Sequence, residues 1–125
     1  NSVPQLSGDR PAQGCEFITI AHGPEPKRWH GGGRPAVWTF NAENSQANNR
    51  PDHPCPKPLD LMKRLIADFT DPGDLILDPF AGSLTTAVAA YQLGRRCIAI
   101  EREERWCEAG VQRLAQMPLP LEVAG

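Results

Sequence analysis

The stretch ILDPFAGSLTTAVAA, residues 76–90, sets an acidic residue and a loop of small residues between an apolar run and a helical pattern. At the carboxyl end of a buried strand, such a loop can bring backbone amides against a ligand. Asp78 ends this apolar run, and Glu101 ends a second run further along the chain. An acid at the end of the second strand can accept hydrogen bonds from both hydroxyls of a ribose. The spacing therefore predicts a ligand that contains adenosine.

The loop sequence narrows the class of ligand. FAGS lacks the full glycine fingerprint of dinucleotide-binding loops and the Gly-Lys-Ser/Thr of phosphate-binding loops, so neither a pyrophosphate nor a triphosphate has an obvious cradle. A nucleoside without phosphates fits better, and S-adenosylmethionine (SAM) is such a ligand. Leu84 stands where loops of this kind normally have glycine.

The elements around this loop follow an α/β order. Apolar residues recur at three- and four-residue steps from Leu59 to Phe69, which predicts one helix with a buried face. Two continuous apolar runs, 74–78 and 96–101, predict central parallel strands covered on both faces. Helices are expected between them, from about Thr85 to Leu93, and after them over 103–116. The two strands should be parallel neighbours joined by a right-handed crossover.

The first part of the chain has another character. CEFITIA (15–21) and AVWTF (36–40) are rich in β-branched and aromatic residues, which predicts a β-hairpin with a long loop. Residues 41–52 show no apolar periodicity and predict an exposed connection. We divide the chain into a hairpin and loop region (1–52), a cofactor-binding α/β region (53–117) and a tail (118–125), within one structural domain.

Length and composition restrict the class of protein. The chain has 125 residues, a formal net charge of −2 and a pI near 5.9, which argues against coating of nucleic acid by charge alone. The four cysteines form no Cys-x-x-Cys pair, which predicts reduced thiols and no metal site. No apolar run approaches the length of a membrane span, so we expect a soluble, cytoplasmic protein.

Several motifs together resemble one enzyme family. HPCPKP (53–58), DPFAGSLTT (78–86), GRRCIAIE (94–101) and the late Arg-Leu pair of the last helix are similar to the C-terminal part of bacterial and phage DNA amino-methyltransferases. These enzymes methylate adenine N6 or cytosine N4 with SAM. The motif order resembles the subgroup in which the catalytic motif precedes the cofactor motif, and residues 4–40 further resemble phage-type members.

The resemblance implies a fold and a set of site residues. It implies an α/β fold, namely a partial Rossmann-like sheet of a SAM-dependent methyltransferase with flanking helices and the hairpin. Phe80, Ala81 and Gly82 would surround the methionine side of SAM, and Glu101 would hold its ribose. The remaining cofactor residues that we expect are His53, Lys57, Pro58, Asp78, Ser83, Leu84, Thr85 and Thr86. Among them, Thr85 and Thr86 begin a helix whose first amides can bind the SAM carboxylate.

DNA contacts are expected from the loop between the two hairpin strands. Lys27, Arg28, Trp29 and Arg34 combine basic and aromatic side chains that can contact phosphates or stack on a base. A solvated hairpin loop explains the same residues equally well. HGGG (30–33) is similar to an esterase oxyanion loop, but the chain contains no Gly-x-Ser-x-Gly nucleophile motif.

The chain departs from the family at two places. Leu84 replaces a glycine; at a positive φ it would cost about 1–2 kcal/mol, and at an ordinary φ its side chain would compete for cofactor space. Both alternatives predict weakened SAM binding. The family's catalytic signature, an Asp, Asn or Ser followed by Pro-Pro and an aromatic residue, is absent, since the chain contains no Pro-Pro. We therefore expect no catalytic residue in this chain.

These departures define the partners and the alternatives. Double-stranded DNA is the expected substrate, and a missing N-terminal catalytic segment, a second copy or a partner subunit is expected to cover exposed apolar strand surface. One alternative is a non-catalytic, degenerate methyltransferase-fold module or subunit. A further alternative is a methyltransferase that acts on RNA or on a small molecule.

Overall fold

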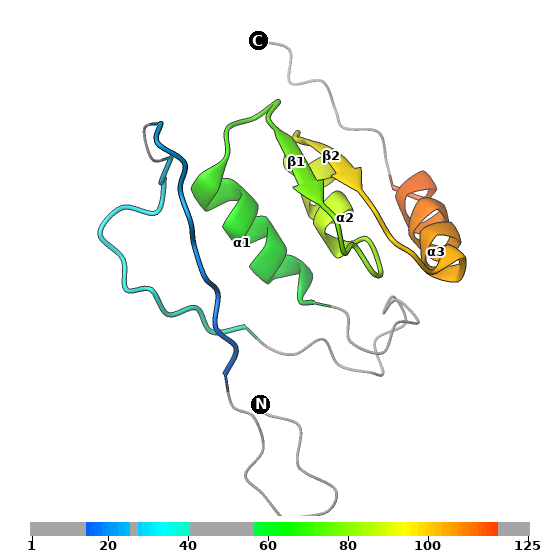
Figure 1. The fold of residues 1–125 in the computed structure, drawn as a ribbon, viewed down its shortest axis with the longest axis horizontal. Coiled ribbons are helices and arrows are strands. Elements are labelled where there is room, and N and C mark those ends of the chain that lie inside the picture. Colours follow the sequence, from blue (N-terminus) through cyan, green and yellow to red (C-terminus); the bar gives the residue numbers. More distant parts are fainter. Residues whose placement is uncertain (1–14, 26–27, 41–56, 118–125) are drawn as a thin grey trace, which may run out of the picture.

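The computed structural model describes residues 15–25, 28–40 and 57–117, so His53 and Lys27 lie outside the described residues. Three helices alternate with two strands in these residues (Figure 1). Their bounds are α1 Leu59–Phe69, β1 Leu75–Asp78, α2 Thr85–Gln92, β2 Arg96–Ala99 and α3 Glu104–Ala115. The element order predicted for the second part of the chain is therefore confirmed.

The two strands form a parallel ladder, as predicted. Leu75 pairs with Arg96 and Asp78 pairs with Ala99, so both carboxyl ends lie at the same edge of the sheet. Backbone bonds continue beyond both ends of the ladder: Arg96 donates to the Asp74 carbonyl at 2.8 Å, and Ile100 donates to the Asp78 carbonyl at 2.8 Å. The ladder thus holds the residues after Asp78 beside the residues after Ala99.

Local chemistry explains where the helices end. The Thr70 amide and hydroxyl both donate to the Ile66 carbonyl, at 3.0 and 2.6 Å, and close the last turn of α1. Gly73 then adopts φ +85° in the turn into β1, and Gly94 adopts φ +70° after α2. These left-handed conformations suit glycine, which has no Cβ.

The core lies on one face of the sheet. Ile66 of α1 packs with Ala89 and Ala90 of α2, and Ile76 and Cys97 of the strands contact this cluster. A second cluster joins the loop and α2 to α3 on the same side; it contains Ala81, Leu84 and Ala87, with Cys97, Ala99 and Leu114 packed against it. The three helices therefore form a single layer.

The described residues leave the opposite face of the sheet bare. Leu75 is 53% exposed and Leu77 62%, while Ile98 is 49% and Ile100 53% exposed. Alternate residues of a strand point to opposite faces, so these four aliphatic side chains lie on the side away from the helices. We call this set of residues the bare face. The prediction that both faces of the strands are covered is wrong for the described residues, which supply only one layer of helices.

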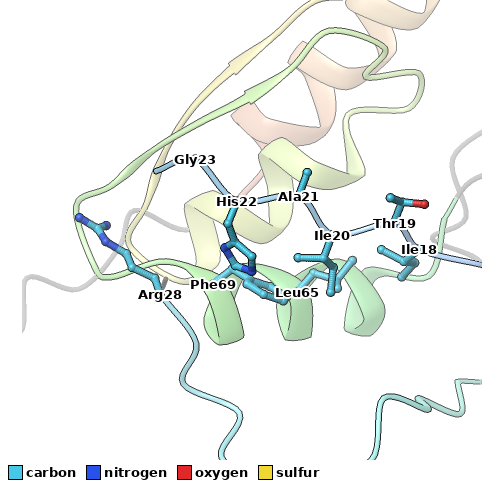
Figure 2. A pocket seen from close by; sticks show the side chains of 9 residues that line it. All are labelled: Ile18, Thr19, Ile20, Ala21, His22, Gly23, Arg28, Leu65 and Phe69. Atoms are coloured by element: carbon cyan, nitrogen blue, oxygen red, sulfur yellow. The ribbon is translucent and has the colours of Figure 1, made fainter. Parts of the chain in front are cut away.

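The predicted β-hairpin is also wrong. Within the described residues the sheet has two strands, β1 and β2, and neither 15–21 nor 36–40 is a strand. Figure 2 shows instead that the 18–23 segment lies along α1, with Ile20 and His22 beside Leu65 and Phe69. An isolated two-stranded hairpin is marginal in water, and a long glycine- and proline-rich loop adds closure entropy. Packing on α1 is the arrangement that the segment adopts.

Candidate functional site

Backbone hydrogen bonds fold the loop 79–84 over the carboxyl ends of the strands. Ala81 donates its amide to the Ile100 carbonyl at 2.9 Å, which ties the loop to the residue after β2. The Asp78 carboxylate accepts the Phe80 amide at 3.1 Å. The Asp78 side chain therefore contacts the loop through the backbone amide of Phe80. The structure brings the two sequence-predicted strand-end acids, Asp78 and Glu101, to one edge.

Glu101 connects the loop to the start of α3. Its Oε2 accepts the Gly82 amide at 2.8 Å, and its Oε1 accepts the Glu103 amide at 2.9 Å. An ionised carboxylate offers about four acceptor positions, so it can serve several donors at once. The side chain is thus oriented by the backbone at the point where a ligand hydroxyl could donate to it.

The loop presents one aromatic side chain to solvent. Phe80 is 90% exposed, whereas the following Ala81 is buried. A phenylalanine so exposed gains nothing from the core of the described residues, but it offers an apolar surface on the loop whose Gly82 amide is bound by Glu101. The edge of the sheet therefore combines an acid with a large apolar side chain, which suits a ligand that has both hydroxyls and apolar groups.

Leu84 occupies the position before α2 in a left-handed conformation. Its φ is 57° and its ψ is 27°, and its side chain is buried against α3 and is not directed into open space over the loop. The first of the two alternatives for this residue is therefore observed: the backbone is strained. The second, a side chain that competes for ligand space, is not the geometry found.

The hydroxyl residues around Leu84 are buried. Ser83, Thr85 and Thr86 are all buried, and the Ser83 and Thr85 hydroxyls lie 3.1 Å apart at hydrogen-bonding distance. The contact between the Ser83 and Thr85 hydroxyls joins the loop to the first turn of α2. What this turn can offer a ligand is its backbone, because the first amides of a helix have no acceptor within the helix.

Lys57 and Pro58 lie where α1 begins. Pro58 precedes the helix and accepts the Met62 amide at 3.2 Å. Lys57 Nζ lies 2.7 Å from Glu16 Oε2, and both side chains are about half exposed. This ion pair connects the segment that begins at residue 15 to the HPCPKP motif. Glu16 was not predicted from the sequence, since no local pattern relates it to Lys57.

The basic loop lies at the amino ends of the strands, opposite the end where Glu101 lies. Arg28 forms ion pairs with Asp71 and Asp74 in the turn that leads into β1, at the amino end of the strands. Hydrogen bonds from the Asp71 amide and from Arg28 hold the pKa of Asp74 below its ordinary value, and bonding to Asp74 raises the pKa of Arg28. The structure therefore separates Arg28 from the Glu101 edge.

Trp29 is held in the same loop. Its ring lies 5.1 Å from the Phe69 ring at 50°, and its Nε1 donates to the Gly32 carbonyl at 2.7 Å. Gly31 is buried beneath this ring, where a Cβ would lie 2.2 Å from the nearest ring carbon. Trp29 is 39% exposed, so part of its ring faces solvent. Arg34 is exposed further along the loop.

A parallel sheet with a glycine-containing loop at its carboxyl edge is the architecture of nucleotide-binding α/β proteins. Comparison with known sequences makes the assignment specific, because a family described as "DNA methylase" matches residues 16–112. The chain belongs to the DNA methylase family.

Individual relatives agree with this family. The chain is 41% identical over 78 residues to the DNA adenine methyltransferase YhdJ of Escherichia coli, covering 62% of this chain and 26% of the relative. It is 42% identical over 77 residues to the type II methyltransferase M2.MboI of Moraxella bovis, covering 62% and 28%. The chain thus spans about a quarter of the length of these curated relatives.

A solved structure extends the match. The crystal structure of the M1.HpyAVI–SAM complex superposes with a TM-score of 0.59 at 29% identity, covering 73% of this chain and 45% of that chain. The predicted α/β methyltransferase fold is therefore confirmed, apart from the hairpin. In the described residues, no helix combines the length and the apolar character that crossing a bilayer requires.

Proposed function

We propose that this chain carries the SAM-binding part of a DNA methyltransferase that acts on adenine N6 or cytosine N4. The observation that carries the proposal is the Glu101 carboxylate, held by the Gly82 amide at 2.8 Å over the ends of two parallel strands, in a chain of the DNA methylase family. When bound, SAM supplies an electrophilic methyl group.

The residues at this edge fit the parts of SAM. Glu101 would accept hydrogen bonds from the ribose hydroxyls, and Phe80 would cover an apolar part of the molecule. The first amides of α2 would receive the SAM carboxylate, helped by the partial positive charge of a helix start. Lys57 and Pro58 would form the opposite wall together with His53, which lies outside the described residues.

We further propose that the catalytic group is supplied by polypeptide other than these 125 residues. The chain has no Pro-Pro sequence, and its curated relatives are about four times longer than the part it matches. The bare face supports this proposal, since parallel strands are normally covered by helices on both faces. The occupant that we propose is the catalytic portion of the same enzyme, in the same polypeptide or in a partner subunit.

The substrate and location follow as part of this proposal. Double-stranded DNA is the substrate that we infer from the family, and a cytoplasmic location follows from that substrate. Because Arg28 and Trp29 make contacts within the chain, DNA contact at this loop would fall to Arg34, Lys27 and the exposed side of the Trp29 ring.

Two measurements test the proposed function. Titration calorimetry should show that the chain binds SAM and that Glu101→Gln weakens binding by about tenfold, the loss expected for a charged hydrogen-bond acceptor. A methyl-transfer assay should show activity on DNA, and none on RNA or small-molecule acceptors, only when the catalytic portion is supplied together with this chain. Inactivity with and without the catalytic portion, together with no SAM binding, would favour the non-catalytic module, for which the left-handed Leu84 and the missing Pro-Pro signature are the arguments.

The bare face can be tested separately. Leu77→Lys places a charge at the centre of this face and should leave the chain folded but prevent complementation by the catalytic portion. Val111→Lys, at an aliphatic residue of α3 that is exposed to the same degree as Leu77, is the control and should complement normally. Sedimentation analysis gives the competing result: a dimer of the wild-type chain that Leu77→Lys dissociates would assign the bare face to a second copy.

A further inference from the structure

Three consecutive residues of the loop contact α3 or the segment just before it. Gly82 donates its amide to Glu101, which precedes α3, at 2.8 Å. The next carbonyl, of Ser83, accepts a hydrogen bond from Arg113 of α3 at 3.4 Å. The third residue, Leu84, packs its side chain against Gly110 of α3. The loop that leads into α2 is therefore shaped by a different helix.

The contact between Leu84 and Gly110 leaves no room for a side chain at position 110. A Cβ built on Gly110 would lie 2.5 and 2.7 Å from the two Leu84 Cδ atoms and 2.8 Å from its Cγ. Because all three carbons are closer than van der Waals contact, the whole isobutyl group would have to move. It has little room to do so, since Leu84 is buried among Ala81, Ala87 and Leu114.

Both residues are unfavourable in their own local structure. Leucine is disfavoured at φ 57°, and glycine is disfavoured within a helix. Together they are compatible, because the absent Cβ of Gly110 leaves the volume that the Leu84 side chain fills. The packing of this pair supplies the reason why a non-glycine residue keeps a left-handed conformation here.

We infer that Gly110 is a positioning residue, which holds the loop 79–84 in its ligand-binding conformation through Leu84. The Gly82 amide and the start of α2 lie on either side of Leu84, so a shift of this side chain displaces both. The consequence for SAM affinity rests on the proposed function, whereas the consequence for the loop itself does not.

A double-mutant cycle tests the inference. Gly110→Ala should raise hydrogen exchange at the Gly82 amide by about tenfold and weaken SAM binding by about threefold or more, within the coupling range of residues in contact. Leu84→Ala removes the three atoms that collide but keeps its own Cβ. In this background, Gly110→Ala should change both quantities by less than about twofold. Val111→Ala, also on α3 and 61% exposed, is the matched control and should change neither.

The possible outcomes are distinct. An unchanged exchange rate at Gly82 in Gly110→Ala, or an equal effect of Gly110→Ala in both backgrounds, overturns the inference. If Gly110→Ala fails to fold alone, recovery of folding in the double variant supports it. If neither folds, Arg113→Gln decides: faster Gly82 exchange supports control of the loop by α3, and an unchanged rate overturns it. A wild-type chain that does not bind SAM refutes the proposed cofactor role, while the exchange cycle still decides the inference.

Discussion

Because Leu84 is left-handed, we predict that replacement by glycine destabilises the protein less than replacement by alanine, the reverse of the usual order. Leu84 is 8% exposed, so truncation to alanine should cost about 2–4 kcal/mol in burial and cavity terms. Alanine keeps a Cβ at φ 57°, and thus keeps the strain of about 1–2 kcal/mol that glycine would relieve. Against this relief, glycine loses one further methyl group, worth about 0.8 kcal/mol. We expect Leu84→Gly to be more stable than Leu84→Ala by up to about 1 kcal/mol.

Urea denaturation of matched pairs measures this difference. Ile66, which is 5% exposed within α1, is the control, because Ile66→Gly should be less stable than Ile66→Ala by about 1 kcal/mol from helix propensity and by about 0.8 kcal/mol from the lost methyl group. The order of the two variants should therefore reverse between the sites. If alanine is more stable than glycine by the same amount at both positions, the left-handed conformation of Leu84 is refuted.

Three further predictions concern other residues. Asp74 has a pKa below its unfolded value of about 3.9, so its stabilising effect should be present above that pH and disappear as the pH falls further; the difference in Tm between the wild type and Asp74→Asn should shrink accordingly. Arg28→Ala should lower Tm more at pH 7 than at pH 3, and equal losses would contradict the ion pair as its cause. Phe80→Ala should leave Tm unchanged, since its ring is 90% exposed, yet weaken SAM binding in calorimetry by about tenfold if the ring contacts the ligand.

Much of the second part of the chain could be predicted from sequence. The apolar period over 59–69, the two apolar runs and the glycine at 94 predicted helices and strands whose observed bounds agree closely. The order of these elements also placed Asp78 and Glu101 at one edge, because neighbouring parallel strands end on the same side. The direct bond between Glu101 and the Gly82 amide needed the structure, since it depends on how the loop folds back.

In the first part of the chain, the residue pattern predicted the wrong secondary structure. β-branched residues predicted strands over 15–21 and 36–40, but a strand forms only with a partner, and these segments do not pair with each other. Ile20 and His22 lie instead along α1, beside Leu65 and Phe69 (Figure 2). The Arg28 side chain likewise meets two carboxylates of the turn after α1, far along the sequence.

Sequence by itself determined the period of each element, the parallel order of the strands and the edge where the acids gather, because these depend on neighbours along the chain. Tertiary structure alone decided that the described residues cover only one face of the sheet, that Leu84 is left-handed and that Gly110 makes room for it. The presence of Gly110 within an amphipathic helix indicates that another segment packs closely there, but the sequence does not identify that segment. Packing contacts join residues distant in sequence, and the handedness of a turn follows from those contacts.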